Sequence, residues 1–145
     1  RPRTPARPDM SWVDVAFAFV VCHLAGDYLL QTDWQARHKH GGLRRGAGIE
    51  RRALLAHTLS YTLAFVPALV WVATTADLGA AAIAGIAALV AVPHLLQDDG
   101  RVVTWWMADV KHTDAEAAAG VALAVDQTLH LLALVALAIL VAGVT

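Results

Sequence analysis

The sequence predicts an all-α integral membrane protein, a four-helix bundle whose helices are joined by two polar cytoplasmic loops. Three observations predict it. Of the 145 residues, 58% are hydrophobic and only 16% are charged, whereas soluble domains average about 45–50% apolar and about 25% charged residues. Four segments are apolar over about 20 residues, the length of a helix that spans a bilayer. Most of the basic residues lie between these segments.

The four predicted spans follow one another at residues 11–31, 53–75, 78–98 and 119–144. Asp77, Leu78 and Gly79 separate the second from the third, which predicts a tight antiparallel hairpin. Pro67 and Pro93 lie inside spans, and membrane helices tolerate such kinks because neighbouring groups satisfy the freed carbonyls. Residues 1–10 are rich in Pro and Arg and are interpreted as a leader, disordered or added by cloning. Residues 11–145 are expected to form a single transmembrane helical domain.

The two polar connections predict the topology. Residues 32–52 carry six Lys and Arg residues and several glycines, which indicates a mobile loop. Residues 99–118 place Arg101 and Lys111 beside Trp105 and Trp106, which favours a short interfacial helix between the third and fourth spans. These connections hold eight of the eleven Lys and Arg residues. The positive-inside rule therefore places both loops in the cytoplasm and both termini outside, although three arginines before Met10 count against this topology.

Ionisable residues interrupt the apolar spans in a regular pattern. A His and an Asp stand four residues apart in the first, third and fourth spans, so each pair shares one helix face, and a lone His lies in the second. Burying one Asp at a helix centre costs about 2.5–3.5 kcal/mol. At about 1.5 Å per residue, all seven groups fall within roughly 15 Å of the cytoplasmic face, which predicts one shared site. These residues are His23, Asp27, His57, His94, Asp98, Asp126 and His130.

The pattern His-Leu-x-x-Asp occurs twice, at residues 23–27 and 94–98. Each copy is followed by a polar loop and then by a span that carries a histidine, His57 or His130. Both copies would enter the membrane from outside, which indicates parallel repeats related by an axis along the membrane normal. Such an axis would bring the two motifs together at the centre of the bundle. A chance match of so short a pattern is the competing explanation.

Imidazole and carboxylate groups are ligands of zinc, manganese and iron, and helical bundles often build metal sites from inward-facing side chains. Four histidines and three aspartates exceed the needs of one tetrahedral ion. They suit one or two divalent ions (Zn, Mn or Fe), the pair bridged by a carboxylate as in two-metal hydrolases. All seven residues are therefore candidate ligands, and Asp27, Asp98 and Asp126 are also the catalytic candidates, because one of them can remain free as a general base.

Substrate contacts are expected next to this site. Gln31 and Gln127 flank it and can bind substrate or orient ligands. Arg51, Arg52 and Arg101 lie at its cytoplasmic mouth, where they can hold an anionic headgroup such as phosphate. Membrane lipids and a lipid or amphiphilic substrate are the expected partners, and a homo-oligomer is compatible with the sequence. No nucleic-acid-binding motif is present.

The sequence therefore favours a membrane-embedded, metal-dependent hydrolase that acts on a lipid or amphiphile from the cytoplasmic leaflet. One alternative is a metal-ion or proton transporter or channel, in which the same residues relay ions. A second is a haem protein with paired axial histidines, which the accompanying aspartates disfavour. A third is a structural subunit whose polar core fixes helix register. His57 alone is more typical of a hydrogen-bonded core residue, and each His–Asp pair alone of an interhelical clamp.

Four strings of residues resemble a bacterial membrane family catalogued as domain of unknown function 3307, over about residues 13–134. The resemblance implies a small multi-span protein of the bacterial cytoplasmic membrane in which these positions matter, and it implies no activity. Where the family is expected to have a basic residue after Asp98, this chain has Asp99-Gly100-Arg101. A looser similarity links the pattern to membrane-bound metal-dependent hydrolases. The strings are His23-Leu-Ala-Gly-Asp27-Tyr-Leu-Leu-Gln31-Thr-Asp33-Trp34, Leu54-Leu-Ala-His57, His94-Leu-Leu-Gln-Asp98 and Asp126-Gln127-Thr-Leu-His130.

Overall fold

The computed structural model describes residues 10–143, and every regular element in this part of the chain is a helix. The leader interpreted at residues 1–10 lies outside the described residues except for Met10, as does the predicted end of the fourth span at Val144. The elements are α1 (Trp12–Leu24), the π-helix η1 (Ala25–Leu29), α2 (Asp33–His38), α3 (Ile49–Ala64), α4 (Val66–Ala76), α5 (Ala80–Asp98), α6 (Arg101–Trp105), the π-helix η2 (Trp106–Val110) and α7 (Ala119–Gly143).

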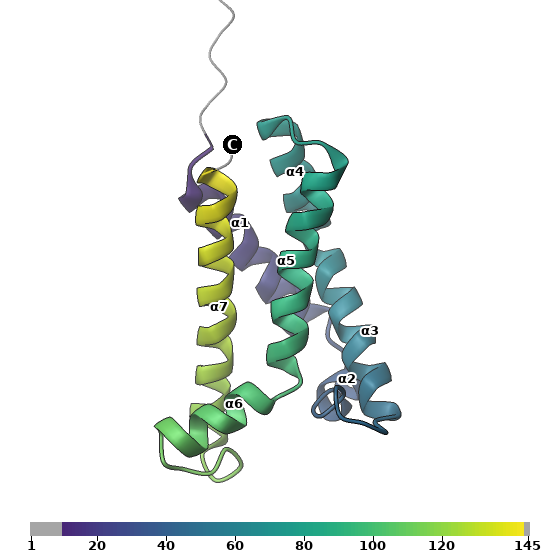
Figure 1. Ribbon diagram of the computed structural model, residues 1–145, viewed down its shortest axis with the longest axis vertical. Helices are drawn as coiled ribbons and strands as arrows, with labels where there is room; N and C mark the ends of the chain where they lie inside the picture. Colours follow the sequence, from purple (N-terminus) through teal and green to yellow (C-terminus); the bar gives the residue numbers. More distant parts are fainter. Residues whose placement is uncertain (1–9, 144–145) are drawn as a thin grey trace, which may run out of the picture.

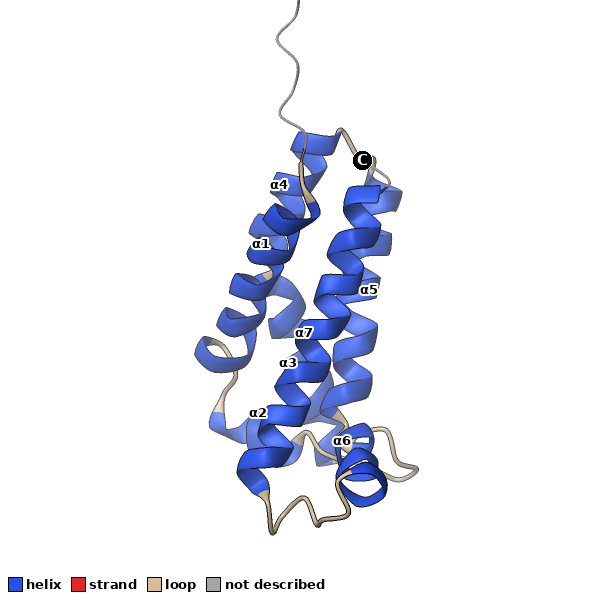
Figure 2. Cartoon of the chain, turned by 90° about the vertical axis from the view of Figure 1, so that its left-hand side faces the viewer, coloured by secondary structure: helices blue, strands red, loops and turns tan. Residues whose placement is uncertain are grey.

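The long helices run side by side along the length of the molecule (Figure 1). Helix α1 packs against α7, and α5 packs against both α3 and α7. The start of α1, the α4–α5 turn and the end of α7 lie at one end, which we call the turn end (Figures 1 and 2). The short elements α2, α6 and η2 lie at the opposite end, which we call the loop end. All the polar connections therefore meet at the loop end.

Three helical segments are long and apolar enough to cross a membrane: Trp12–Leu29, Ala80–Asp98 and Ala119–Gly143. The pair α3–α4 is a fourth if it counts as one span. These are the four segments that the sequence predicts.

The second predicted span is not a straight helix. Helices α3 and α4 meet at Phe65 with a bend of 43°. The physical reason is Pro67, which has no N–H group to donate to the Leu63 carbonyl, so the helical hydrogen-bond ladder breaks one turn earlier. The predicted hairpin is present, because Asp77 adopts a left-handed conformation (φ 56°) and ends α4 before α5 begins.

The interior divides into two halves. We call the half next to the turn end the turn half, and the half next to the loop end the loop half. Apolar side chains from α1, α3, α4, α5 and α7 fill the turn half, among them Phe19, Phe65, Val72 and Leu137. The buried charged and imidazole groups lie in the loop half. Large apolar side chains also cover the outer surface of the long helices, among them Phe17, at 71% exposure.

The connection at residues 32–52 contains the short helix α2 and a turn that contacts the end of α5. Thr32 and Gln35 form a reciprocal capping box that starts α2, because each side chain accepts a backbone N–H group at the helix start. The following turn is fixed to the end of α5, where the Gly41 N–H donates to the Asp99 carbonyl (2.9 Å) and the Leu43 N–H to the Asp99 carboxylate (2.7 Å). The helix predicted between the third and fourth spans is present as α6 and η2.

Candidate metal centre

Five ionisable side chains converge where the long helices meet in the loop half. Each of the five residues is at most 9% exposed. They come from four segments that are distant in sequence: η1, α3, α5 and α7. We call this set the His/Asp cluster, and its members are Asp27, His57, His94, Asp98 and His130.

The donor atoms of the cluster are spaced like ligands of one small cation. The His57 Nε2 lies 3.3 Å from the Asp27 Oδ1, 2.9 Å from the Asp98 Oδ2 and 3.0 Å from the His94 Nε2. The His94 Nε2 lies 3.2 Å from the Asp98 Oδ2 and 3.8 Å from the Asp27 Oδ1. A tetrahedral ion with bonds of about 2.0–2.1 Å holds neighbouring ligand atoms about 3.3–3.4 Å apart. Three of these atoms, the Asp27 Oδ1, the His57 Nε2 and the His94 Nε2, could therefore hold a single divalent ion, and the Asp98 Oδ2 lies beside both imidazoles.

The possible ligands form two groups of three that share His94. Asp27 and His57 complete one group, and Asp98 and His130 complete the other. The His130 Nδ1–H donates to the Asp126 carbonyl at 2.9 Å, which leaves the Nε2 lone pair free and directed at the Asp98 Oδ1, 3.5 Å away. The two Asp98 oxygens thus face different groups. This is the arrangement of a carboxylate that bridges two ions.

Unpartnered polar atoms provide a test of whether a cation fits. The Asp27 Oδ1 and the His130 Nε2 are buried, and neither forms a hydrogen bond within the described part of the chain; the Nδ1 atoms of His57 and His94, on the opposite side of each ring from the Nε2, are also without a partner there. Leaving such a group unsatisfied costs about 1–3 kcal/mol. The Asp27 Oδ1 and the His130 Nε2 point into the cluster, where a metal ion would accept their lone pairs, so the donor set fits a metal centre.

Local sequence explains how Asp27 enters the cluster. The π-helical turn of η1 widens the end of the first span, and such turns often re-aim side chains at functional sites. Gly26 allows α3 to approach closely, because a Cβ atom here would lie 2.6 Å from the Tyr61 Cδ2. The sequence motif His-Leu-Ala-Gly-Asp thus supplies a carboxylate together with the small residue that lets the facing helix reach it.

His23 lies at the edge of the cluster, where it contacts supporting residues. Its Nδ1 is 3.1 Å from the Tyr61 hydroxyl, and its Nε2 is 3.1 Å from the Gln127 Oε1. Tyr61 in turn stacks flat on the His94 ring, with centroids 3.4 Å apart. Both His23 nitrogens therefore have hydrogen-bonding partners, and His23 belongs to neither three-residue group. This geometry suits a residue that holds Tyr61 and Gln127 in place.

Lys39 contacts Asp98 of the cluster, which the sequence did not predict. Its Nζ lies 2.8 Å from the Asp98 Oδ2, and its side chain is only 12% exposed. The Thr32-x-x-Gln35 capping box predicts a helix over the next residues, and this signal places Lys39 at the end of α2. Nothing in the sequence brings that residue to the end of α5.

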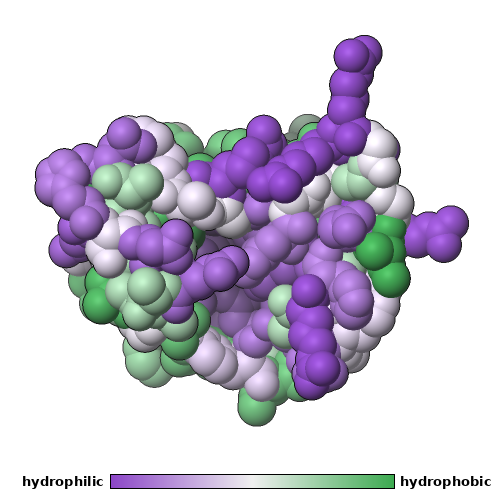
Figure 3. Space-filling view, turned by 90° about the horizontal axis from the view of Figure 1, so that it is seen from below, coloured by the Kyte–Doolittle hydropathy of each residue, from purple (hydrophilic) through white to green (hydrophobic). Residues whose placement is uncertain are grey.

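A cavity of about 900 Å³ adjoins the cluster and reaches the loop end. The face at this end is hydrophilic and hollowed at its centre (Figure 3). Four polar residues lie on the cavity wall beside the cluster: Asp27, Gln31, Asp126 and Gln127. Further out the wall carries four basic residues, and α6, η2 and α7 contribute an apolar side that includes Val103, Trp105, Ala119 and Leu123. The four basic residues are Lys39, His40, Arg44 and Arg101.

Some of the remaining predicted site residues line the cavity, and others do not. Asp126 is 22% exposed, faces the cavity and lies outside both three-residue groups. Gln31, Gln127 and Arg101 line the cavity as predicted for substrate contacts. Arg51 and Arg52 are not among its lining residues. The Arg51 guanidinium instead donates to the carbonyls of Gly42 and Arg44, which fixes the turn after α2.

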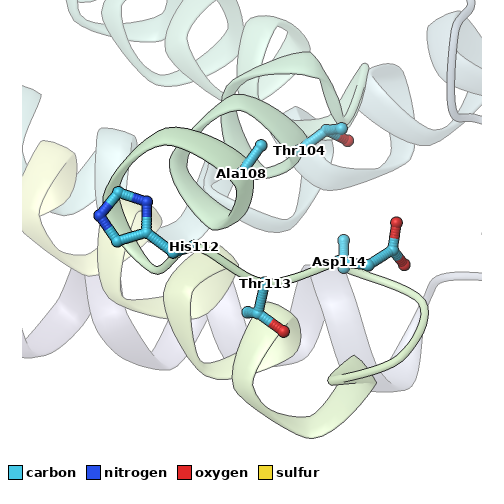
Figure 4. A pocket seen from close by; sticks show the side chains of 6 residues that line it. Thr104, Ala108, His112, Thr113 and Asp114 are labelled. Carbon is cyan, nitrogen blue, oxygen red and sulfur yellow. The ribbon is translucent and has the colours of Figure 1, made fainter.

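A second pocket, of about 450 Å³, lies between α6, η2 and the segment before α7. Its lining includes His112 and Asp114, whose side chains point in opposite directions (Figure 4). No group of possible metal ligands in the described residues includes either side chain. We therefore assign the candidate site to the His/Asp cluster and the larger cavity.

The chain belongs to the family described as protein of unknown function (DUF3307), whose model matches residues 15–145. The match covers nearly the whole chain and includes every residue of the cluster. Comparison with curated proteins and with solved structures gives no match.

Proposed function

We propose that this protein is an integral membrane four-helix bundle with a His/Asp metal centre of one or two divalent ions. We further propose that it is a hydrolase acting on an amphiphile whose headgroup enters the cavity from the cytoplasmic side. The observation that carries this proposal is the convergence of buried imidazole and carboxylate donors in two groups of three, each close enough to share one ion.

The exposed surface supports insertion in a membrane. Large apolar side chains are exposed along the length of the molecule, such as Leu59 on α3 at 63% and Leu132 on α7 at 61%. Soluble monomers rarely expose an apolar patch larger than a few hundred Å². Lipid tails would cover such side chains, and the basic loop end would face the cytoplasm.

The position of Asp126 supports hydrolysis. Ester hydrolysis needs a group that takes a proton from the attacking water and returns it to the leaving oxygen. Asp126 lies on the cavity wall next to the cluster without belonging to either group of ligands, so its carboxylate is placed for this task. A bound divalent ion would supply Lewis-acid activation of the ester.

The apolar turn half supports an enzyme over a channel. A path for protons or ions across the membrane needs polar groups at successive depths. Beyond the cluster, the described core consists of side chains such as Val15, Phe19, Val90 and Val141. The polar site therefore opens only toward the loop end.

Metal analysis of the purified chain tests the site. Wild-type protein in detergent should bind one or two equivalents of zinc, manganese or iron, and both His94→Ala and Asp98→Asn should lose at least about tenfold in affinity, because each removes a ligand. His38→Ala is the matched control, since His38 hydrogen-bonds to the Trp34 carbonyl of its own helix and belongs to neither group of possible ligands. Circular dichroism and size-exclusion profiles report whether each variant folds.

The activity is tested with the same proteins on micelles of phosphate and carboxylic ester amphiphiles. Metal-loaded wild type and His38→Ala should hydrolyse at least one class, and His94→Ala should not. A wild-type protein that folds but binds no divalent metal contradicts the whole proposal. Metal binding without hydrolysis of any amphiphile contradicts the enzymatic part.

A further inference from the structure

Lys39 forms a buried ion pair with one of the proposed metal ligands. Its Nζ lies 2.8 Å from the Asp98 Oδ2, with the two side chains 12% and 1% exposed. Among the described residues, no other Lys or Arg side chain forms an ion pair with the His/Asp cluster. The ammonium therefore neutralises a carboxylate that burial would otherwise leave costly.

The same oxygen is central to the donor set. The Asp98 Oδ2 is 2.9 Å from the His57 Nε2 and 3.2 Å from the His94 Nε2, so a divalent ion bound by these atoms would lie close to the Lys39 ammonium. Like charges in a buried, low-dielectric site repel strongly. The ion and the ammonium thus compete for one carboxylate.

The cavity offers the Lys39 ammonium a second position. Lys39 is one of the residues that line the cavity. Gly41, two residues further on, has a left-handed backbone (φ 77°) and starts the turn away from α2. A lysine side chain rotates freely about its four-carbon stem, so the ammonium can turn from Asp98 into the cavity. The wall there already carries the basic side chains of Arg44 and Arg101.

We propose that Lys39 exchanges partners: it pairs with Asp98 until a divalent cation binds, and then it turns into the cavity and binds the anionic group of the substrate. This inference rests on the proposed metal centre. It names the substrate class as amphiphiles or small molecules that carry a phosphate group, since a freed ammonium is a point-charge partner for phosphate. It also sets an order, in which the metal binds before the anion.

The first half of the proposal, that a divalent cation displaces Lys39 from Asp98, is tested by the zinc affinity of the full chain in detergent. This affinity is measured by competition with a chromophoric chelator. Lys39→Met keeps the apolar stem and removes the charge, so it should bind zinc about tenfold more tightly than wild type. Lys39→Gln, which keeps a hydrogen-bond donor for Asp98, should also gain affinity. Arg44→Met is the matched control, an exposed cation of the same cavity wall, and should stay within about twofold.

A stability measurement separates this role from a merely structural one. In the presence of a chelator, Lys39→Met should unfold at a lower temperature than wild type, because Asp98 loses its ion pair with the Lys39 ammonium. Zinc should abolish the difference. If wild type binds zinc and both Lys39 variants bind it no more tightly, the exchange is wrong and the metal centre stands. If wild type binds none of zinc, manganese and iron, both proposals fail.

Phosphate binding to the zinc-loaded protein tests the second half. Inorganic phosphate and phosphatidic acid in nanodiscs are the two probes, with phosphatidylcholine nanodiscs as the blank. Binding should be weaker by about tenfold in Lys39→Met. If Lys39→Met binds only phosphatidic acid more weakly, the anion is a lipid headgroup. If it binds only inorganic phosphate more weakly, the anion is a free one. Equal binding by Lys39→Met and wild type overturns this half.

Discussion

Individual side chains of the cluster are held in place by neighbours that bind no ion. Tyr61 shows this most clearly, because its ring lies parallel to His94, with an angle of 4° between them, and its hydroxyl contacts His23. The Tyr61 ring thus restricts the orientation of the His94 imidazole. On the other side, the Gln31 Nε2 lies 3.1 Å from the His57 Nε2, the nitrogen that is also offered to the ion, so this amide would have to turn aside for His57 to bind metal.

Gly26 is the residue on which this packing depends. Gly26→Ala should lower stability by about 1–3 kcal/mol, as overpacking does, because the new Cβ would sit 2.6 Å from the Tyr61 Cδ2 and push Tyr61 from His94. Metal affinity should fall as well. Thermal unfolding in detergent and zinc titration check both effects.

Gly85→Ala is the control for this substitution. Gly85 is also a helical glycine, but a Cβ atom there meets nothing within 4 Å, so the variant should be neutral or slightly more stable, in keeping with helix propensity. If Gly26→Ala behaves like Gly85→Ala, the close approach of η1 to α3 is not needed for the site.

At the scale of elements, the turn after α2 is held against the end of α5. Asp99 is 2% exposed, and its carboxylate accepts the Leu43 N–H and pairs with Arg101. Its carbonyl accepts the Gly41 N–H. These contacts bring Lys39 to Asp98, so a loop rich in glycine is fixed beside the cluster.

Removing the Asp99 carboxylate should release this turn. Asp99→Ala leaves the Leu43 N–H without its acceptor, a loss of about 1–3 kcal/mol for a buried group. Limited trypsin digestion should therefore cut faster at Arg44 and Arg45 than in wild type. Asp33→Ala removes an exposed carboxylate of α2 that pairs only with Arg37, and it should leave the cleavage rate unchanged. Equal rates in the two variants would show that Asp99 does not restrain the turn.

At the scale of the whole molecule, charge and polarity are segregated along the long axis. The loop end carries the basic residues and the cavity, and the turn half is apolar inside. In a membrane this asymmetry sets the orientation, since short loops rich in Lys and Arg stay in the cytoplasm. The candidate site would then be reached from the cytoplasm.

Cysteine labelling checks this orientation. In a chain whose single cysteine, Cys22, is replaced by Ala, one new cysteine is placed at Arg45 or at Leu78. An impermeant maleimide should label Leu78→Cys in right-side-out vesicles and Arg45→Cys in inverted vesicles. The opposite pattern would place the cavity outside the cell.

The sequence predicted the helical class and the apolar segments, because hydrophobic length is a local signal. It also predicted one site for seven ionisable groups; five of them form the cluster, and His23 and Asp126 lie outside both ligand groups. The bend at Phe65 was within reach too, since Pro67 marks it. Other features depend on contacts between distant segments. The position of Lys39 on Asp98, the retention of Arg51 by backbone carbonyls and the π-helical turn at Asp27 arise from how the helices pack, which no local pattern encodes.

The flat stack of Tyr61 on His94 has a consequence for ion selectivity. The Tyr61 ring blocks movement of the His94 imidazole to one side, and the donor atoms around that imidazole have the short separations that small borderline cations require. Calcium takes six to eight oxygen ligands at about 2.3–2.6 Å, and magnesium keeps most of its water in an octahedral shell. A site of imidazoles and two carboxylates offers neither arrangement. The protein would therefore discriminate against calcium and magnesium by size and by donor type.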